Sequence, residues 1–455
     1  MKTNFNLAEI NGFARYYGFH YECCDSGTLI KSFRVAMERG LSGRDSSLAM
    51  IPSGLSPRLH TGAGKKVLAI DAGGTNLRVA RISFDGDSKP VTEDKRGMPM
   101  PGSNGPLTRE EFFSALADFC EPLFDGGVDG IGFCFSYPME LEPDGDGVPL
   151  SFSKEIELKD MIGRPIVKGF REALARRKIK TPERITLLND TVSALLCGIL
   201  TIPPMFPSKF AVFGQNLPKI MPATDNEAVG LILGTGFNIA YCEKSVPKIG
   251  FVSENEPQIV VCEAGNFNFG QQGALDLEFD SSTKDPGVHT AEKVISGAYL
   301  GPLSLHILKR AVKDGLLRFE KSAELLAMDR LATKEINEFL QAPLVAGGPI
   351  ASLFAPDEDD ARKTVICLES IITERAALIT ASALAAIASH CGSARDPLAP
   401  MRIAVEGSTF SMYHFLEEAV RARLRSMLNA DGPRFCVVQT VEQASLFGAA
   451  VAALP

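Results

Sequence analysis

The sequence lacks several features that mark particular classes of protein. Its ten cysteines include no CxxC pair, which removes the usual signal of a zinc ribbon or a redox dithiol. It has no basic run, and its formal net charge of −8 argues against nucleic acid or an anionic membrane as a partner. No apolar run of membrane-spanning length stands out, and the alanine-rich stretch 376–389 is expected to be a core helix.

The remaining composition is that of an ordinary globular protein. Its 455 residues exceed what one small core organises, so two domains are expected. Hydrophobic residues make up 45% and charged residues 22% of the chain. Scattered cysteines and a start without an apolar signal core predict reduced thiols and a cytoplasmic location. The sequence leaves open whether the protein is a monomer or a homodimer.

Strands and helices are expected to alternate along the chain. Apolar runs predict strands, and amphipathic spacing predicts helices between them, at 68–70, 77–82, 108–120, 130–135, 163–178 and 185–189. Residues 228–243 restart the pattern as strand, glycine turn and strand, with Thr235 in a place similar to that of Thr75. The alternation predicts a layered α/β protein, and the repeat suggests two related lobes.

A carboxylate and two glycines stand at the tip of the first expected hairpin. Residues 68–82 read LAIDAGGTNLRVARI, so Asp71 precedes Gly73 and Gly74. Glycine allows close approach of a ligand to the backbone, successive N–H groups can hold an anion, and an acid can hold Mg²⁺ through water. Two such hairpins facing each other could clamp a metal–nucleotide. The alternative is that both glycine turns simply close tight hairpins.

A second acid stands where an expected strand gives way to a helix. The stretch 187–198 reads LLNDTVSALLCG and places Asp190 at this junction. Ligands of α/β folds bind at such strand ends, which favours a catalytic role. The alternative is a helix N-cap, a position that aspartate favours, and the two roles can coexist.

Several segments, taken in chain order, resemble the characteristic segments of the hexokinase family. The likeness runs from about residue 28 to the C-terminus. The matching segments are MIPSGL leading to VLAIDAGGTNLRVARI, then GIGFCFSYPME, SFSKEIEL, LLNDTVSALL, GLILGTGFNIAYCE, VCEAGNFNFG, AEKVISGAYLG and IAVEGSTF.

The resemblance implies a two-lobed actin-like ATPase fold of the ribonuclease H-like type, with a mixed sheet and flanking helices in each lobe. It implies a small lobe from residues 66–200 and 441–455, and a large lobe from residues 1–65 and 201–440. It also implies phosphorylation of a hexose, most readily glucose, at the 6-hydroxyl, with ATP and Mg²⁺ as cofactors.

The same resemblance assigns roles to individual residues. Asp190 would be the general base, with Lys154 as a second catalytic residue, and Asp71 would hold Mg²⁺ through water. The sugar-binding positions would be Ser136, Ser153, Lys154, Asn189, Asp190, Asn238, Glu263 and Glu292. The nucleotide-binding positions would be Asp71, Gly73, Gly74, Thr75, Asn76, Arg78, Thr235, Gly407 and Ser408.

Departures from the family pattern concern sugar preference, loop geometry and nucleotide affinity, and they leave the acid–base and phosphate positions intact. Phe152 and Ala264 stand where the family has tryptophan, and Glu406 stands where it has aspartate. Taken singly, Lys154 could be loop surface, and Glu292 could be the acid that suits a helix start. One alternative function is a catalytically weak sugar sensor or regulator on the same fold. Another is an actin-like ATPase acting on proteins, against which the sugar-segment glutamates argue.

Overall fold

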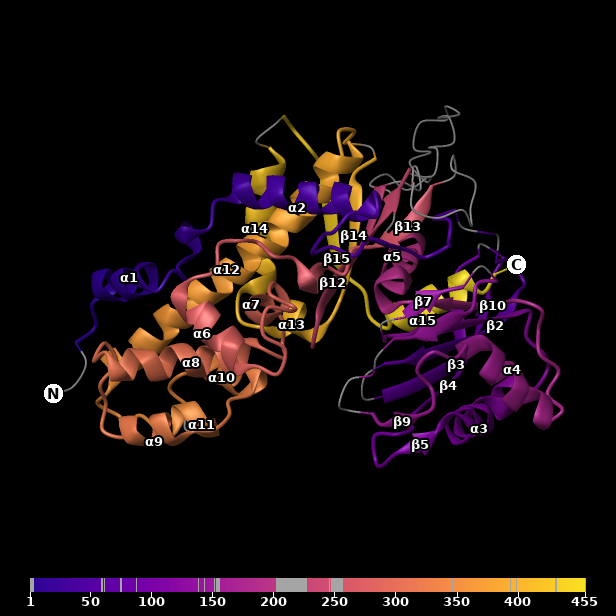
Figure 1. Ribbon diagram of the computed structural model, residues 1–455, viewed down its shortest axis with the longest axis horizontal. Coiled ribbons are helices and arrows are strands. Elements are labelled where there is room, and N and C mark those ends of the chain that lie inside the picture. The colour runs from indigo at the N-terminus through magenta and orange to yellow at the C-terminus, as the bar shows by residue number, and fades with distance from the viewer. Residues whose placement is uncertain are drawn as a thin grey trace, which may run out of the picture.

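The structure is a computed structural model, and two sheets organise it (Figure 1). It describes residues 4–454 except 59, 61, 74–75, 87, 138, 143, 151, 153–155, 202–226, 245, 247–256, 346, 393, 398 and 430–431. We call the five-stranded sheet with its covering helices the small lobe. We call the six-stranded sheet with the larger helical body the large lobe. All ten cysteines fall among the described residues, and no disulfide joins any two of them.

The two sheets share one strand plan. The small-lobe sheet has the order β10–β6–β2–β3–β4, and the large-lobe sheet has the order β1–β13–β12–β11–β14–β15. In each lobe three consecutive strands pair antiparallel, a later strand pairs in parallel with the first of them, and one further strand pairs in parallel with that later strand. The likeness predicted from the two glycine turns therefore extends to the whole sheet, apart from the added β1.

The strands have the following bounds. In the small-lobe sheet they are β2 (Lys66–Ala72), β3 (Asn76–Phe84), β4 (Pro90–Pro99), β6 (Gly130–Phe135) and β10 (Ile185–Leu188). In the large-lobe sheet they are β1 (Ile51–Pro52), β11 (Ala228–Leu233), β12 (Phe237–Glu243), β13 (Gln258–Val261), β14 (Met401–Glu406) and β15 (Cys436–Thr440). Two short pairs lie apart from these sheets: β5 (Leu107–Thr108) with β9 (Leu158–Lys159), and β7 (Met139–Leu141) with β8 (Gly147–Pro149).

Helices α3 (Arg109–Cys120) and α4 (Ile166–Arg176) pack together over the small-lobe sheet. Their buried phenylalanines, among them Phe112 and Phe170, share a core with Leu68 and Phe133 of the strands. A capping box begins α3, because the side chain of Thr108 accepts the N–H of Glu111 while the Glu111 carboxylate accepts the N–H of Thr108. The expected helix at 108–120 is thus confirmed, with Thr108 as its cap.

The large lobe is built around one long helix, α12 (Asp359–Cys391). It packs against α1 (Leu7–Tyr16), α2 (Ser26–Leu41), α7 (Glu292–Ile295), α8 (Leu300–Lys313) and α14 (Leu416–Leu428). By length and composition α12 could cross a membrane, contrary to the expectation that the chain has no such run. However, 94% of its most apolar window is buried within the protein. The prediction that residues 376–389 form a core helix is confirmed.

Shorter helices complete the described structure. They are α6 (Ala274–Ser282), α9 (Ser322–Ala327), α10 (Thr333–Gln341), α11 (Gly348–Ala351), α13 (Ser408–Met412) and the 3-10 turns η1 (Tyr21–Cys23), η2 (Glu121–Phe124) and η4 (Ala264–Asn266). Phe415 has φ of 57°, which a right-handed helix does not accommodate, so α13 and α14 are separate.

Helix α5 (Asp190–Thr201) lies between the two sheets (Figure 1). It packs on β11 and β14 of the large lobe and on α15 (Ala444–Ala452), which in turn packs on β2 and β6 of the small lobe. Two glycines permit this closeness. A Cβ at Gly230 would lie 2.3 Å from the carbonyl oxygen of Thr191, and a Cβ at Gly448 would lie 2.0 Å from that of Ser193. The first turn of α5 is therefore held by backbone contacts on two sides.

Helix α12 carries a fully buried acid, Glu369, in the core of the large lobe. Glu369 of α12 is 0% exposed, and its Oε2 accepts a hydrogen bond from Ser304 Oγ at 2.7 Å. Tyr413 OH is 3.4 Å from the same oxygen. Burial raises the pKa of the Glu369 carboxyl to about 8. Near neutral pH this side chain is therefore protonated in the folded protein and ionised in the unfolded chain.

This difference predicts a pH-dependent stability. Between the unfolded and folded pKa values of Glu369, the free energy of unfolding should fall by about 1.4 kcal/mol per pH unit, because only the folded state keeps the proton. Glu369→Gln removes this titration while keeping the size of the side chain. Denaturation from about pH 5 to about pH 8 should show the variant gaining stability relative to wild type as the pH rises. A constant difference across that range would contradict the assigned titration of Glu369.

Candidate active site

A cleft of about 520 Å³ lies between the two lobes and is lined by both. It gathers twelve of the positions assigned from the sequence: Asp71, Gly73, Asn76, Arg78, Ser136, Asn189, Asp190, Thr235, Asn238, Glu263, Glu292 and Gly407. A pocket of about 370 Å³ shares Arg78 and Gly407 with it and contains Ser408. Gly74, Thr75, Ser153 and Lys154 lie outside the described residues, so their placement stays a prediction.

Asp190 is the first residue of α5, directly after the end of β10 and Asn189. The N–H of Thr191 donates to Asn189 Oδ1 at 2.8 Å and to Asp190 Oδ1 at 2.7 Å. The hydroxyl of Thr191 also donates to both side chains. Asn189 therefore already caps this helix start, and capping alone does not require the carboxylate of Asp190.

The surroundings of Asp190 favour its use as a base. Burial raises the pKa of its carboxyl, while hydrogen bonds from Thr191 and Ser136 act in the opposite direction. Both hydrogen bonds that Thr191 donates to Asp190 go to its Oδ1 atom. A carboxylate with a raised pKa is a better proton acceptor than an exposed aspartate.

The large-lobe wall of the cleft combines an amide with two carboxylates. Asn238 Nδ2 donates to Glu263 Oε1 at 3.1 Å, while Asn238 Oδ1 accepts the N–H groups of Ile239 and Ala264. Glu292 Oε2 accepts the N–H of Phe237 at 2.9 Å. Glu263 itself has φ of 56°, an uncommon backbone conformation for glutamate. The wall thus presents several fixed acceptors and donors, which suits a ligand with many hydroxyls.

Burial dominates the electrostatics of this wall. It raises the pKa of the Glu263 carboxyl to about 7, and the hydrogen bond from Asn238 opposes the rise. Burial also raises the pKa of the Glu292 carboxyl, and the hydrogen bond from the N–H of Phe237 opposes this rise. A ligand that donates hydrogen bonds to these carboxylates would favour their ionised forms.

On the small-lobe side, Asp71 lies at the end of β2 opposite Arg78 of β3. Arg78 Nη1 is 3.3 Å from Asp71 Oδ2. Burial first, and then the charge of Glu406, raise the pKa of Asp71 to about 7, while Arg78 lowers it. No group of three or more metal-ligating side chains among the described residues could hold an ion directly. This arrangement is compatible with a metal held through water, as the sequence predicts.

The adjoining pocket lies beside the end of β14 and the start of α15. Glu406 Oε2 accepts the N–H of Ser445 at 3.0 Å and its hydroxyl at 2.7 Å. The glutamate at the family's aspartate position is therefore engaged in joining β14 to α15. Gly407 follows with φ of 138°, and a Cβ there would lie 2.3 Å from the backbone of Leu233. This tight turn opens the pocket next to Ser408.

Sequence reasoning missed several residues that line these cavities. Tyr137, Asn266, His289 and Ser445 lie in the cleft wall, and Lys95 lies in the adjoining pocket. Tyr137 and Asn266 fall inside segments that the sequence does single out, and Ser445 falls in the stretch 441–455 that the resemblance gives to the small lobe. The only feature of the sequence that points to His289 as a site residue is its position three residues before Glu292. Lys95 carries none, because the sequence pattern does not predict strand β4.

Known proteins resemble this chain along most of its length. Two family models described as "Hexokinase" match residues 19–199 and 228–455. Hexokinase-2 of Candida albicans is 26% identical, over 93% of this chain and 87% of its own length. Hexokinase of Kluyveromyces lactis is 25% identical, over 89% of this chain and 82% of its own length. The match to Hexokinase-3 of Homo sapiens, 26% identical, spans only 42% of the human protein.

A solved structure supports the fold. The structure titled hexokinase from Schistosoma mansoni complexed with glucose matches with a TM-score of 0.74 at 22% identity, covering 98% of this chain and 99% of that chain. The two-lobed fold with a mixed sheet in each lobe is confirmed. The chain belongs to the hexokinase family. It is accordingly a kinase, a phosphotransferase that uses ATP to phosphorylate a sugar.

The raised pKa of Glu263 predicts pH-dependent ligand binding. As the pH falls through about 7, this carboxyl gains a proton and loses part of its capacity to accept hydroxyl donors. With glucose as the probe and no nucleotide present, calorimetry should show affinity weakening from about pH 8 to about pH 6. Glu263→Gln should bind weakly with much less dependence on pH. Equal affinity of the wild type across this range would contradict the role given to Glu263.

Proposed function

We propose that the protein transfers the terminal phosphoryl group of Mg-ATP to the 6-hydroxyl of D-glucose, with Asp190 as general base. The observation that carries this proposal is the position of Asp190. Its carboxylate lines the same cleft as the polar wall of Asn238, Glu263 and Glu292 and as the two turns near Asp71 and Thr235. Few other reactions require a base, a hydroxyl-reading wall and anion-binding turns in one cavity.

The large-lobe wall would orient the sugar. Carboxylates and amides that meet several hydroxyls at once can discriminate strongly, because a sugar lacking one hydroxyl leaves a buried group unpaired. Glu263 and Glu292 would accept hydroxyl donors, and Asn238 is held in place by its bonds to Ile239 and Ala264. The wall would thereby direct one hydroxyl toward Asp190.

Asp190 would accept the proton of the attacking hydroxyl as the phosphoryl group arrives. Phosphoryl transfer depends on positioning and charge neutralisation more than on covalent catalysis by the protein. Arg78 and the turn N–H groups would meet the phosphates, and Ser408 would lie beside the adenosine. Lys154 stays a predicted second catalytic residue.

The residues of the cleft also fit a magnesium ion. Asp71 belongs to no cluster of direct metal ligands among the described residues, but burial first, and then the charges of Glu406 and Asp190, raise its pKa. Such a concentration of carboxylates favours a divalent cation, and Asp71 would hold Mg²⁺ through water. The ion would supply neutralisation of the phosphate charge.

The direct test is a coupled assay of ADP formation from Mg-ATP with glucose, mannose, fructose and glucosamine. We expect sugar-dependent turnover, with the highest kcat/KM for glucose. If another hexose is preferred, the substrate assignment changes while the kinase stands. Absence of turnover with every hexose, despite measurable sugar binding, would instead support the sensor or regulatory alternative.

Asp190→Asn separates the catalytic role from the capping role. General base catalysis contributes about 10²- to 10⁴-fold, so kcat should fall by about that factor. Glucose affinity should change much less, and the melting temperature should stay near that of wild type because asparagine keeps the size of the side chain and Asn189 still caps the helix. The three quantities should be measured on one preparation. Near-normal kcat would remove Asp190 from the mechanism.

A further inference from the structure

The segment 283–291 joins α6 to α7, and α7 begins at Glu292, which lines the cleft. Helix α7 has only four residues, Glu292–Ile295, and no side chain caps its start. So short a helix has little stability of its own, because its first turns form at a net cost. Something outside α7 must therefore hold Glu292 in place.

Lys293, the neighbour of Glu292, supplies such an anchor. Its side chain is 2% exposed, and its Nζ lies 2.6 Å from Asp280 Oδ1 of α6. The same Nζ donates to the carbonyl oxygen of Asp285 at 2.7 Å and lies 3.5 Å from Asp285 Oδ1. A buried ammonium is tolerated only with such compensation. The lysine thus ties α7 to both α6 and the segment 283–291.

Asp280 holds the segment with its second oxygen as well. Its Oδ2 accepts the N–H of Gly287 at 2.7 Å, while its Oδ1 meets Lys293. One carboxylate therefore joins the buried ammonium to the main chain of the segment. Two of these contacts, at the Asp285 carbonyl and the Gly287 N–H, involve the backbone of the segment, so the cluster fixes the path of the chain and not only the spacing of two helices.

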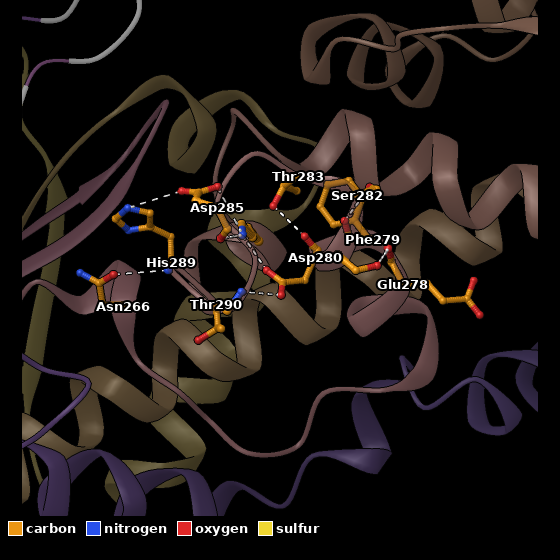
Figure 2. A network of polar contacts seen from close by, with 12 residues as sticks. Asn266, Glu278, Phe279, Asp280, Ser282, Thr283, Asp285, His289 and Thr290 are labelled. Carbon is orange, nitrogen blue, oxygen red and sulfur yellow. Dashed lines mark hydrogen bonds and ion pairs between the residues drawn. The ribbon is translucent and has the colours of Figure 1, made fainter.

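The far end of the segment faces the cleft. His289 lies in the cleft wall with φ of 54°, a conformation that costs free energy for a residue with a side chain. Its N–H donates to Asn266 Oδ1 at 3.3 Å, and its Nε2 is 3.8 Å from Asp285 Oδ2 (Figure 2). Thr290 Oγ1 donates to the carbonyl oxygen of Phe267 at 2.9 Å. Asp285 therefore contacts both the buried Lys293 and His289 in the cleft wall.

We propose that Lys293 and Asp280 are positioning residues for sugar binding, which clamp the segment 283–291 and so hold Glu292 and His289 in the wall of the cleft. The proposal rests on the proposed function, because it takes the sugar as the ligand of this wall. Neither Lys293 nor Asp280 lines the cleft. Their effect passes through the segment, and it should fall on sugar affinity and leave nucleotide affinity unchanged.

The test uses the double variant Asp280→Asn with Lys293→Met. Removing one partner alone would leave the other charge buried and uncompensated, which destabilises strongly. Removing both charges limits this cost and breaks the contacts of Lys293 with the Asp280 carboxylate and the Asp285 carbonyl oxygen. Kinetics with Mg-ATP and glucose should show KM for glucose raised by about 10- to 100-fold, the loss expected for one hydrogen bond to a charged group. The KM for ATP should change by less than about two-fold. The single variant Lys293→Arg, which keeps the positive charge beside Asp280, should retain much of the sugar affinity of the wild type.

A matched control is the buried pair of Arg375 and Asp276, which are 2.6 Å apart in the same lobe and do not line the cleft. The double variant Asp276→Asn with Arg375→Met should lower the melting temperature while leaving both KM values near wild type. An unchanged glucose KM in the Asp280/Lys293 variant, or an equal rise in the control, would overturn the positioning role. Wild-type protein without sugar-dependent turnover would instead overturn the proposed function. Calorimetry with glucose alone would then still test the clamp.

Discussion

The close packing of α5 between the two sheets is the constraint on which the rest of the site depends. The backbone of Thr191 meets Gly230 of the large-lobe sheet, and the backbone of Ser193 meets Gly448 of α15, with no room for a side chain at either glycine. Since Asp190 begins this helix, these main-chain contacts place its backbone, and the hydrogen bonds from Thr191 then orient its carboxylate. Larger residues at Gly230 or Gly448 would displace the proposed base even though neither glycine touches a substrate.

Charge and burial oppose each other throughout the cleft. Asp71, Glu263 and Glu292 are all acids whose pKa values are raised, with burial as the largest cause in each case. Keeping such groups in one cavity costs stability, and functional sites commonly carry that cost. The proposed ligands would relieve it, because hydroxyls donate to the wall carboxylates and a divalent cation neutralises the group near Asp71. Ligand binding thus gives a physical reason for gathering the acids in the cleft instead of dispersing them over the surface.

Local patterns in the sequence predict much of the fold. The hairpin β2–β3, the capped helix α3 and the buried strand β6 each follow from apolar spacing and turn residues. Strand β4 is not predicted because its polar, largely exposed residues lack a clear alternation, and β13 has only four residues. The two-lobed arrangement comes from the family resemblance, since periodicity carries no information on how lobes are paired.

The site is predictable to the extent that its residues lie in recognisable segments. The capping question at Asp190 cannot be decided from sequence, because it requires the hydrogen bonds of Asn189 to be seen. The link from Lys293 through Asp285 to His289 is also hidden, since an ordinary Glu-Lys pair at a helix start suggests only a solvated face. The sequence does not reveal that Lys293 is buried, and this burial shows that the lysine is an internal ion-pair partner and not a solvated surface charge.

The central claim is that one sugar is bound by residues of both lobes, with Asp190 on one side and Glu263 and Glu292 on the other. A ligand that contacts both walls favours the arrangement in which they are close. Small-angle X-ray scattering with and without saturating glucose tests this most directly. We expect a smaller radius of gyration with glucose, and no such change in the Glu263→Gln variant at a concentration it does not bind. An unchanged profile in wild-type protein, with binding shown by calorimetry on the same sample, would contradict it.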